Sequence, residues 1–312
     1  MTDKTKKLLM IVIPIAVVVI AAIIVGIVLL LGGNKETYRT VKVYRIEGSA
    51  EIRRGEGAPI TPYENMMLEN NDEVKTLADS YLYLKLDDDK YLLAEPETSF
   101  RLVATGDAGN SKTRIELTGG AVTIHVTNPL SKDSSFEVGT ANATMAIRGT
   151  SLRVSDDPGD GAEGSTVLQV FEGNVEVQLL NDGLPAGDPT SVGAGEEAIV
   201  TPTEAGVTVD KTEGGIPFIE LSDATLDFLK TGIENGNDVG LSPEEIDDII
   251  ENKGKTFTVS FMYDGKTFAT QRVVYGETAK QPMLMPTAKG SWSFSFETVI
   301  TGDLTVEWIA EK

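Results

Sequence analysis

The residues best placed to do chemistry form a corner, Arg148-Gly149-Thr150, between two stretches that alternate apolar and polar side chains. A guanidinium group can form two parallel hydrogen bonds with a carboxylate or a phosphate, so Arg148 is a candidate ligand-binding residue. A structural role competes with this one. In that role Gly149 supplies a backbone conformation that other residues avoid, Thr150 begins the next strand, and Arg148 binds backbone carbonyls. The sequence favours the structural role for the corner.

Aromatic side chains on one hairpin form a second candidate binding site. Tyr81 and Tyr83 share a face of a predicted strand, and an exposed aromatic pair can bind a glycan or a protein. Packing beneath a neighbouring part of the fold is the simpler interpretation. His125 is the only histidine, and its position between Ile124 and Val126 predicts a solvated side chain whose charge could change near neutral pH.

Three acidic segments, 87–89, 156–160 and 235–240, have side chains that calcium prefers. Aspartate and asparagine also cap the backbone at turns, so we expect ordinary turns there and neither a metal nor another cofactor. The chain has no cysteine, which excludes thiolate metal sites and disulfides. A single histidine argues against a Ser-His-Asp triad or a zinc site built from several histidines.

Net charge narrows the class of partner. The formal charge is −21, which repels nucleic acid and anionic lipid. Paired carboxylates, which a glycoside hydrolase would use, are too frequent in so acidic a chain to indicate one. No glycine-rich phosphate loop or nucleophile elbow is present in the sequence. We therefore expect a protein that is not an enzyme.

An uncharged run of 24 residues, 8–31, predicts a membrane anchor. At about 1.5 Å per residue it spans about 36 Å, enough for a bilayer core of about 30 Å. It is too long for a signal peptide and no cleavage pattern follows it, so we expect an uncleaved helix. Three lysines in residues 1–7 place that tail in the cytoplasm, and the rest of the chain is then extracellular.

The remaining chain divides into three predicted parts. Residues 38–212 alternate apolar and polar side chains in short runs, which predicts about a dozen strands of a sandwich, a roll or a solenoid. Gly119-Gly120 indicates a hairpin turn between two of these strands. Residues 213–255 predict an acidic connector with two short helices, the second starting at a Ser242-Pro243 cap. Alternation returns in residues 256–312.

Five segments of the first part resemble, in order, the motifs of the FecR-like domain of bacterial envelope proteins. They are 67–76, 80–90, 136–154, 170–177 and 192–196. One departure is Asn71, which stands where the family usually carries glycine, but asparagine tolerates the left-handed turn conformation. The resemblance covers residues 38–210 and implies an extracytoplasmic, β-solenoid-like roll that senses or binds. The family's classical regulators carry a cytoplasmic domain before the membrane helix, whereas only seven residues precede it here.

Residues 256–312 resemble the internalin-type B-repeat (the Listeria-Bacteroides repeat) of bacterial surface proteins. The matching segments are 258–261, 264–265, 271–276, 292–296 and 301–306. The family usually ends its aromatic stretch with Gly-Trp, and Phe296-Glu297 stands there instead. The resemblance implies a small β-grasp-like domain in a single copy.

These observations predict a mainly β, single-pass protein of the bacterial cell membrane that binds an extracellular ligand, either a protein or a glycan. If it signals, a transmembrane partner must carry the signal, since seven residues are too few to fold. The alternative is an adhesion or structural protein whose C-terminal domain engages cell wall, matrix or host surface. The candidate ligand-binding residues are Arg148, Tyr81 and Tyr83.

Overall fold

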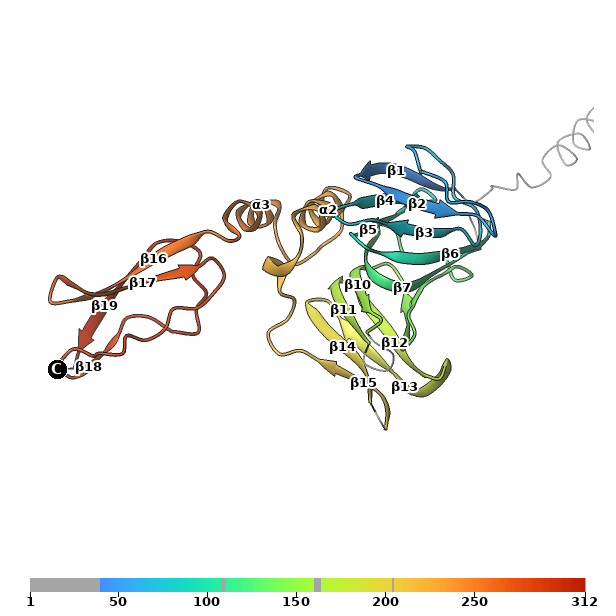
Figure 1. The fold of residues 1–312 in the computed structure, drawn as a ribbon. Coiled ribbons are helices and arrows are strands. Elements are labelled where there is room, and N and C mark those ends of the chain that lie inside the picture. Colours follow the sequence, from blue (N-terminus) through green and yellow to red (C-terminus); the bar gives the residue numbers. More distant parts are fainter. Residues whose placement is uncertain (1–39, 108–109, 160–163, 204, 312) are drawn as a thin grey trace, which may run out of the picture.

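The computed structural model describes residues 40–107, 110–159, 164–203 and 205–311. Strands β1–β15 form one body, two short helices follow, and a sheet of four strands completes the chain (Figure 1). The membrane helix predicted at 8–31 lies outside the described residues. Among the residues that are described, no helix is long and apolar enough to cross a membrane.

The first body is built from fifteen strands that alternate inward and outward side chains. The strands are β1 (Val41–Glu47), β2 (Ala50–Arg53), β3 (Glu73–Thr76), β4 (Tyr81–Leu86), β5 (Lys90–Ala94), β6 (Ser99–Gly106), β7 (Ser111–Val126), β8 (Ser135–Gly139), β9 (Ala143–Ile147), β10 (Ser151–Asp157), β11 (Ser165–Glu172), β12 (Asn174–Asn181), β13 (Leu184–Gly193), β14 (Glu196–Thr203) and β15 (Gly206–Lys211).

These strands form two sheets that share β7. The first sheet has the order β1-β4-β5-β7-β10-β11-β14-β15, and the second has the order β2-β3-β6-β7-β8-β9-β12-β13. Residues 111–119 of β7 pair within the second sheet, and residues 120–126 pair within the first. The predicted hairpin turn at Gly119-Gly120 is therefore wrong, because both glycines lie inside one strand that passes between the sheets.

Gly120 shows why glycine is needed at this crossing. Its φ is +82°, and a Cβ at this position would come within 2.4 Å of the Thr98 backbone. Any other residue would be strained by its conformation and would collide with that backbone. The glycine pair thus allows β7 to bend closely around the turn that precedes β6.

We call the body formed by β1–β15 the roll. Among its described residues the strand pairs are antiparallel, except that β7 and β8 are parallel. A β-solenoid stacks parallel coils, so the solenoid component of the expected fold is wrong. The chain instead crosses between two facing sheets at glycine corners. Inward side chains of both sheets fill one core, as Leu84 and Ile124 of the first sheet and Phe100 and Val138 of the second illustrate. Burying each such side chain contributes about 1.5–3 kcal/mol.

The turn before β3 contains the asparagine that departs from the family motif. Asn71 has a φ of +68°, which confirms that asparagine adopts the left-handed conformation there. The next residue, Asp72, is fully buried and accepts two hydrogen bonds from the Arg54 guanidinium, at 2.9 and 2.8 Å. The Asp72 hydrogen bond is the main reason why the pKa of Arg54 is raised. The turn is therefore held by a two-point contact with the loop after β2.

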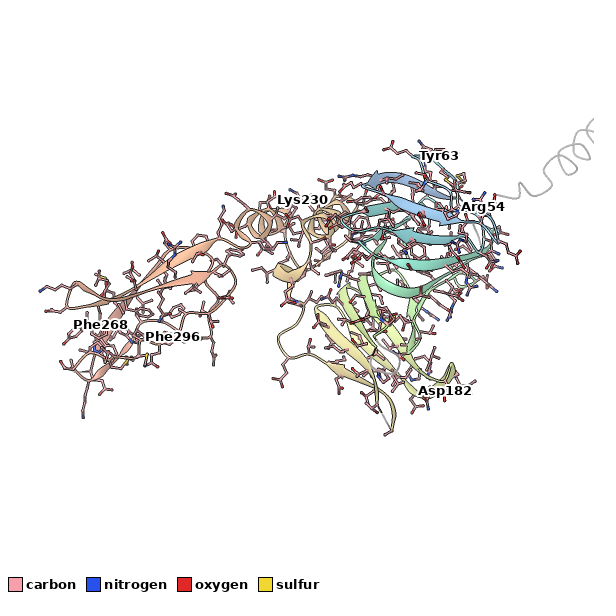
Figure 2. All side chains as sticks on the ribbon, in the orientation of Figure 1. Arg54, Tyr63, Asp182, Lys230, Phe268 and Phe296 are labelled. Atoms are coloured by element: carbon pink, nitrogen blue, oxygen red, sulfur yellow. The ribbon has the colours of Figure 1, made fainter. Side chains whose placement is uncertain are left out.

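The connector forms the two predicted helices, α2 (Asp223–Glu234) and α3 (Pro243–Asn252), after a short 3-10 helix, η1 (Phe218–Glu220). Ser222 caps α2, and Ser242 with Glu245 forms a capping box on α3. Leu226, Leu229 and Ile246 pack in one apolar cluster with Phe171 of β11, so the helices lie against the roll. Lys230, labelled in Figure 2, joins α2 to α3 through Asp247.

The C-terminal sheet consists of β16 (Thr256–Tyr263), β17 (Lys266–Val274), β18 (Gly290–Trp292) and β19 (Leu304–Ala310), in the order β17-β16-β19-β18. Its central pair, β16 and β19, is parallel, as a β-grasp arrangement would have. Trp292 is the centre of its core and packs against Phe261, Phe268 and Trp308. Phe268 and Phe296 are labelled in this sheet in Figure 2.

Candidate functional site

The Arg148-Gly149-Thr150 corner joins β9 of the second sheet to β10 of the first. Gly149 has a φ of +89°, and a Cβ there would lie 3.1 Å from Cα of Pro129. Thr150 is 1% exposed, and its carbonyl oxygen accepts a hydrogen bond from the amide of Val126 at 3.1 Å. The corner is therefore fixed by backbone conformation and strand pairing.

Arg148 is exposed and forms no hydrogen bond or ion pair with any residue that the structure describes. Our interpretation of this residue as a strut for backbone carbonyls is not supported by the structure, because Arg148 donates to none of the described carbonyls and the Thr150 carbonyl is bound by a strand amide. The guanidinium group points to solvent beside a rigid corner. In a chain of net charge −21, it is a cation that can meet an anionic group without first breaking an ion pair.

The tyrosines lie on the outer face of the first sheet, where they form a cluster with aromatic neighbours. Tyr83 is 3% exposed and packs against Phe228 of α2, whereas Tyr81 is half-buried at the edge of the cluster. Tyr44 lies between Tyr83 and Tyr91, with ring centroids 5.7 and 6.0 Å apart. The structure thus leaves Tyr83 no open face for a ligand while α2 is in place.

Charges and burial around this cluster keep its phenols protonated. The Arg45 guanidinium lies 4.9 Å from the centre of the Tyr83 ring, and the Tyr83 hydroxyl donates to Glu47 at 3.3 Å. Burial raises the pKa of Tyr44 to about 12, and burial together with Glu47 raises the pKa of Tyr83 further. Both side chains are therefore hydrogen-bond donors and packing groups at physiological pH.

His125 lies in the same face, and its predicted exposure is wrong. Its side chain is 2% exposed and stacks on Phe228, with ring centroids 4.5 Å apart. Alternation correctly places it on the outer face of β7, but that face is covered by α2. Burial lowers the pKa of His125 to about 4, and the carbonyl of Phe228 opposes this shift only in part.

The acidic turn at 87–89 has a structural partner in Lys90. This lysine is 4% exposed, and its ammonium group lies 2.6 Å from Asp89 and 3.5 Å from Asp87. Those carboxylates compensate a buried cation. Within the described residues, no group of three or more His, Asp or Glu side chains is arranged to hold a metal ion.

A hollow that our sequence reasoning missed lies on the outer face of the second sheet. Its volume is about 420 Å³, and it is lined by Glu51, Arg53, Pro59, Glu73, Val74, Lys75, Ser99, Phe100, Arg101, Glu116 and Thr118. Arg101 pairs with Glu116 at 2.8 Å, but Arg53 and Lys75 have no ion-pair partner among the residues described. Alternation in β2 and β3 could have placed these cations on one face. It could not have shown that the face is hollow.

Comparison with known proteins gives one family match. Two crystal structures of a candidate anti-sigma factor from Parabacteroides distasonis ATCC 8503 are similar at 18% and 19% identity, each with a TM-score of 0.38. The match covers 51% of this chain, which spans 64% of the length of those structures, and it is too weak to support an argument about function. No curated protein matches the chain significantly. Residues 72–176 match the family model described as FecR protein, so this segment is a FecR domain.

Proposed function

We propose that the chain is a non-enzymatic sensing or binding module of the bacterial envelope, anchored by residues 8–31, with the roll as its working surface outside the cell. The FecR match over residues 72–176 is the observation that carries this proposal. The match includes the corner at Arg148, where a guanidinium without an ion-pair partner among the described residues stands beside a glycine of fixed conformation. A solvent-facing cation beside a rigid backbone corner suits an anionic group on a ligand or partner.

The test is photo-crosslinking in intact cells with the photoreactive residue at position 128, which is exposed and precedes Pro129, the neighbour of Gly149, so that Arg148 itself is kept. The matched control position is Asp182, which Figure 2 labels on the turn between β12 and β13 of the same roll. We expect one specific product from position 128, and we expect Arg148→Glu in the same chain to abolish it. Equal products from both positions, no product from position 128, or a product that persists in Arg148→Glu would contradict a binding role for the corner.

The adhesion alternative is supported by a separate observation in the C-terminal sheet. Met283 and Leu284 are 101% and 78% exposed, and they lie between two buried prolines, Pro282 and Pro286. Exposed apolar residues held in this way are a common feature of contact surfaces. If the alternative is correct, Met283→Ser with Leu284→Ser will reduce cell attachment while leaving crosslinking at position 128 intact.

A further inference from the structure

The outer face of the first sheet is covered by α2, and the contact between them is partly polar. His125 of β7 uses both ring nitrogens in it. Nε2 lies 3.0 Å from the carbonyl oxygen of Phe228, and Nδ1 lies 2.6 Å from Oγ of Ser151. The assignment that satisfies both contacts is a neutral ring, in which Nε2 donates to the carbonyl and Nδ1 accepts from the serine hydroxyl.

The fit between helix and ring is close. A Cβ on Gly232 of α2 would lie 2.6 Å from the His125 ring, so only glycine allows the helix to approach this near. Phe228 stacks on the same ring and also contacts Tyr83. The ring therefore loses nearly all contact with water when the helix is in place.

The groups that face this contact offer no charge to compensate a protonated ring. The titratable and charged side chains of the strands packed here include Tyr83 of β4, Tyr91 of β5, Arg153 of β10 and Glu172 of β11, together with Glu95 directly after β5. Arg153 binds both oxygens of the Glu95 carboxylate, at 2.7 and 2.9 Å, so these two charges offset each other. Asp227 and Lys230 are the charged residues of the adjoining turns of α2. The Glu172 carboxylate is bound to the Asn237 amide at 2.7 Å, Asp227 is exposed, and Lys230 is bound to Asp247. A charged His125 would thus be buried without an anionic partner, which is costly.

The far end of the same contact contains a polar atom that the covered state leaves unsatisfied. Oδ1 of Asn237, shortly after α2, is buried without a hydrogen-bond partner among the described residues, while the Asn237 amide nitrogen donates to Glu172 of β11 at 2.7 Å. Water would bind this oxygen if the helix and the segment after it moved away, and its burial costs free energy as long as they stay. The covered state is therefore less favourable than its apolar contacts alone would make it.

We propose that α2 is a releasable strap, which covers this face of the roll while His125 is neutral and is released in acid by protonation of His125. This inference goes beyond the proposed function and does not depend on the identity of any ligand. Release would uncover Tyr83, Leu93 and Phe228, an apolar surface that the closed state hides.

The absence of cysteine from the sequence permits a direct test in the full chain. Leu93 is fully buried beneath Phe228, so in Leu93→Cys the new thiol reacts with dithiodipyridine only when the strap is open. Val138 is equally buried, but inside the core between the sheets, so Val138→Cys reports opening of the roll itself. Each labelling rate is divided by the rate of the urea-unfolded chain at the same pH.

We expect the normalised rate of Leu93→Cys to rise about tenfold for each pH unit below about 6.5, as one proton is taken up on opening. Val138→Cys should react far more slowly at every pH. Adding His125→Gln, whose amide can still donate to the Phe228 carbonyl, should remove the rise between pH 6.5 and 5. If that variant does not give the parent circular dichroism spectrum at pH 7.5, His125→Asn takes its place.

Two results would overturn the proposal. Equal rates with equal pH dependence at positions 93 and 138 would mean that strap and roll open together. A full pH-dependent rise that persists in the folded His125 variant would mean that other groups release the helix.

Discussion

Arg148 and Gly149 are neighbours under opposite constraints. Gly149 has a positive φ and lies against the Pro129 backbone, whereas Arg148 extends into solvent without a partner among the described residues. Substitution of the glycine should therefore affect folding, and substitution of the arginine should affect only what the corner binds.

For Gly149→Val we expect a loss of roughly 1–3 kcal/mol in the free energy of unfolding, measured by urea titration. Gly183→Val is the control, because Gly183 also has a positive φ (+76°) but has no atom within 4 Å of its Cβ position. The control should lose less stability, since only Gly149 meets a backbone. Equal losses would show that contact with Pro129 plays no part.

Arg148→Ala should change the free energy of unfolding by less than about 0.5 kcal/mol, because the side chain is exposed and unpaired within the described structure. Arg54→Ala is the contrasting variant, since it removes both hydrogen bonds to the buried Asp72 carboxylate. The same urea titration measures both variants. A loss above 1 kcal/mol for Arg148→Ala would restore the structural role that the sequence favours.

The buried histidine predicts how stability depends on pH. The pKa of His125 is about 4 when folded and about 6.5 when unfolded, so between these values the unfolded chain binds more protons. Stability contributed by the neutral ring is complete above pH 6.5 and is lost as the pH falls toward 4, by at most about 3 kcal/mol. The difference in unfolding free energy between wild type and His125→Gln, measured from pH 7.5 to 4, should shrink by that amount. A constant difference would contradict a neutral buried ring.

At the scale of elements, local patterns predicted the strands and helices well. Alternation located β6 and β12 because each has one face on the core, apolar spacing located α2, and the Ser242 cap located the start of α3. What covers an outer face is not a local property. The burial of His125 and Tyr83 depends on Phe228, which is 103 residues from His125 in sequence. The candidate site was for this reason predicted less well than the strands that carry it.

The role of α2 can be tested on the helix itself. Phe228→Ala should remove the stacking on His125 and Tyr83 and raise amide hydrogen exchange throughout α2. Thr231→Ala, on the exposed face one turn away, should leave exchange unchanged or slightly slower because alanine favours helix. Similar exchange in the two variants would mean that α2 is held by Leu226 and Leu229 without help from Phe228.

At the scale of the whole molecule, the domain boundary predicted at residue 212 falls between two regions that pack against each other. Alternation ends there, but the connector that follows packs Leu226, Leu229 and Ile246 against Phe171 of the roll. The roll and the helices therefore share apolar contacts that sequence periodicity could not reveal. The C-terminal sheet has its own core, and its contacts with the connector include the bond from the Tyr275 hydroxyl to Asp248 at 2.7 Å.

This arrangement predicts that residues 38–312 unfold in two steps, the roll with its helices in one and the C-terminal sheet in the other. Both tryptophans of the chain, Trp292 and Trp308, pack against each other in the C-terminal sheet, so tryptophan fluorescence reports that sheet alone. Far-ultraviolet circular dichroism reports mainly the larger roll. With only about 57 residues and no disulfide, the sheet should unfold at the lower urea concentration.

A truncated chain, 38–255, should keep the later transition, whereas 38–212 should be less stable because Phe171, Tyr83 and Leu93 lose their cover. Coincident fluorescence and dichroism transitions in residues 38–312 would instead show that roll, helices and sheet fold as one cooperative unit.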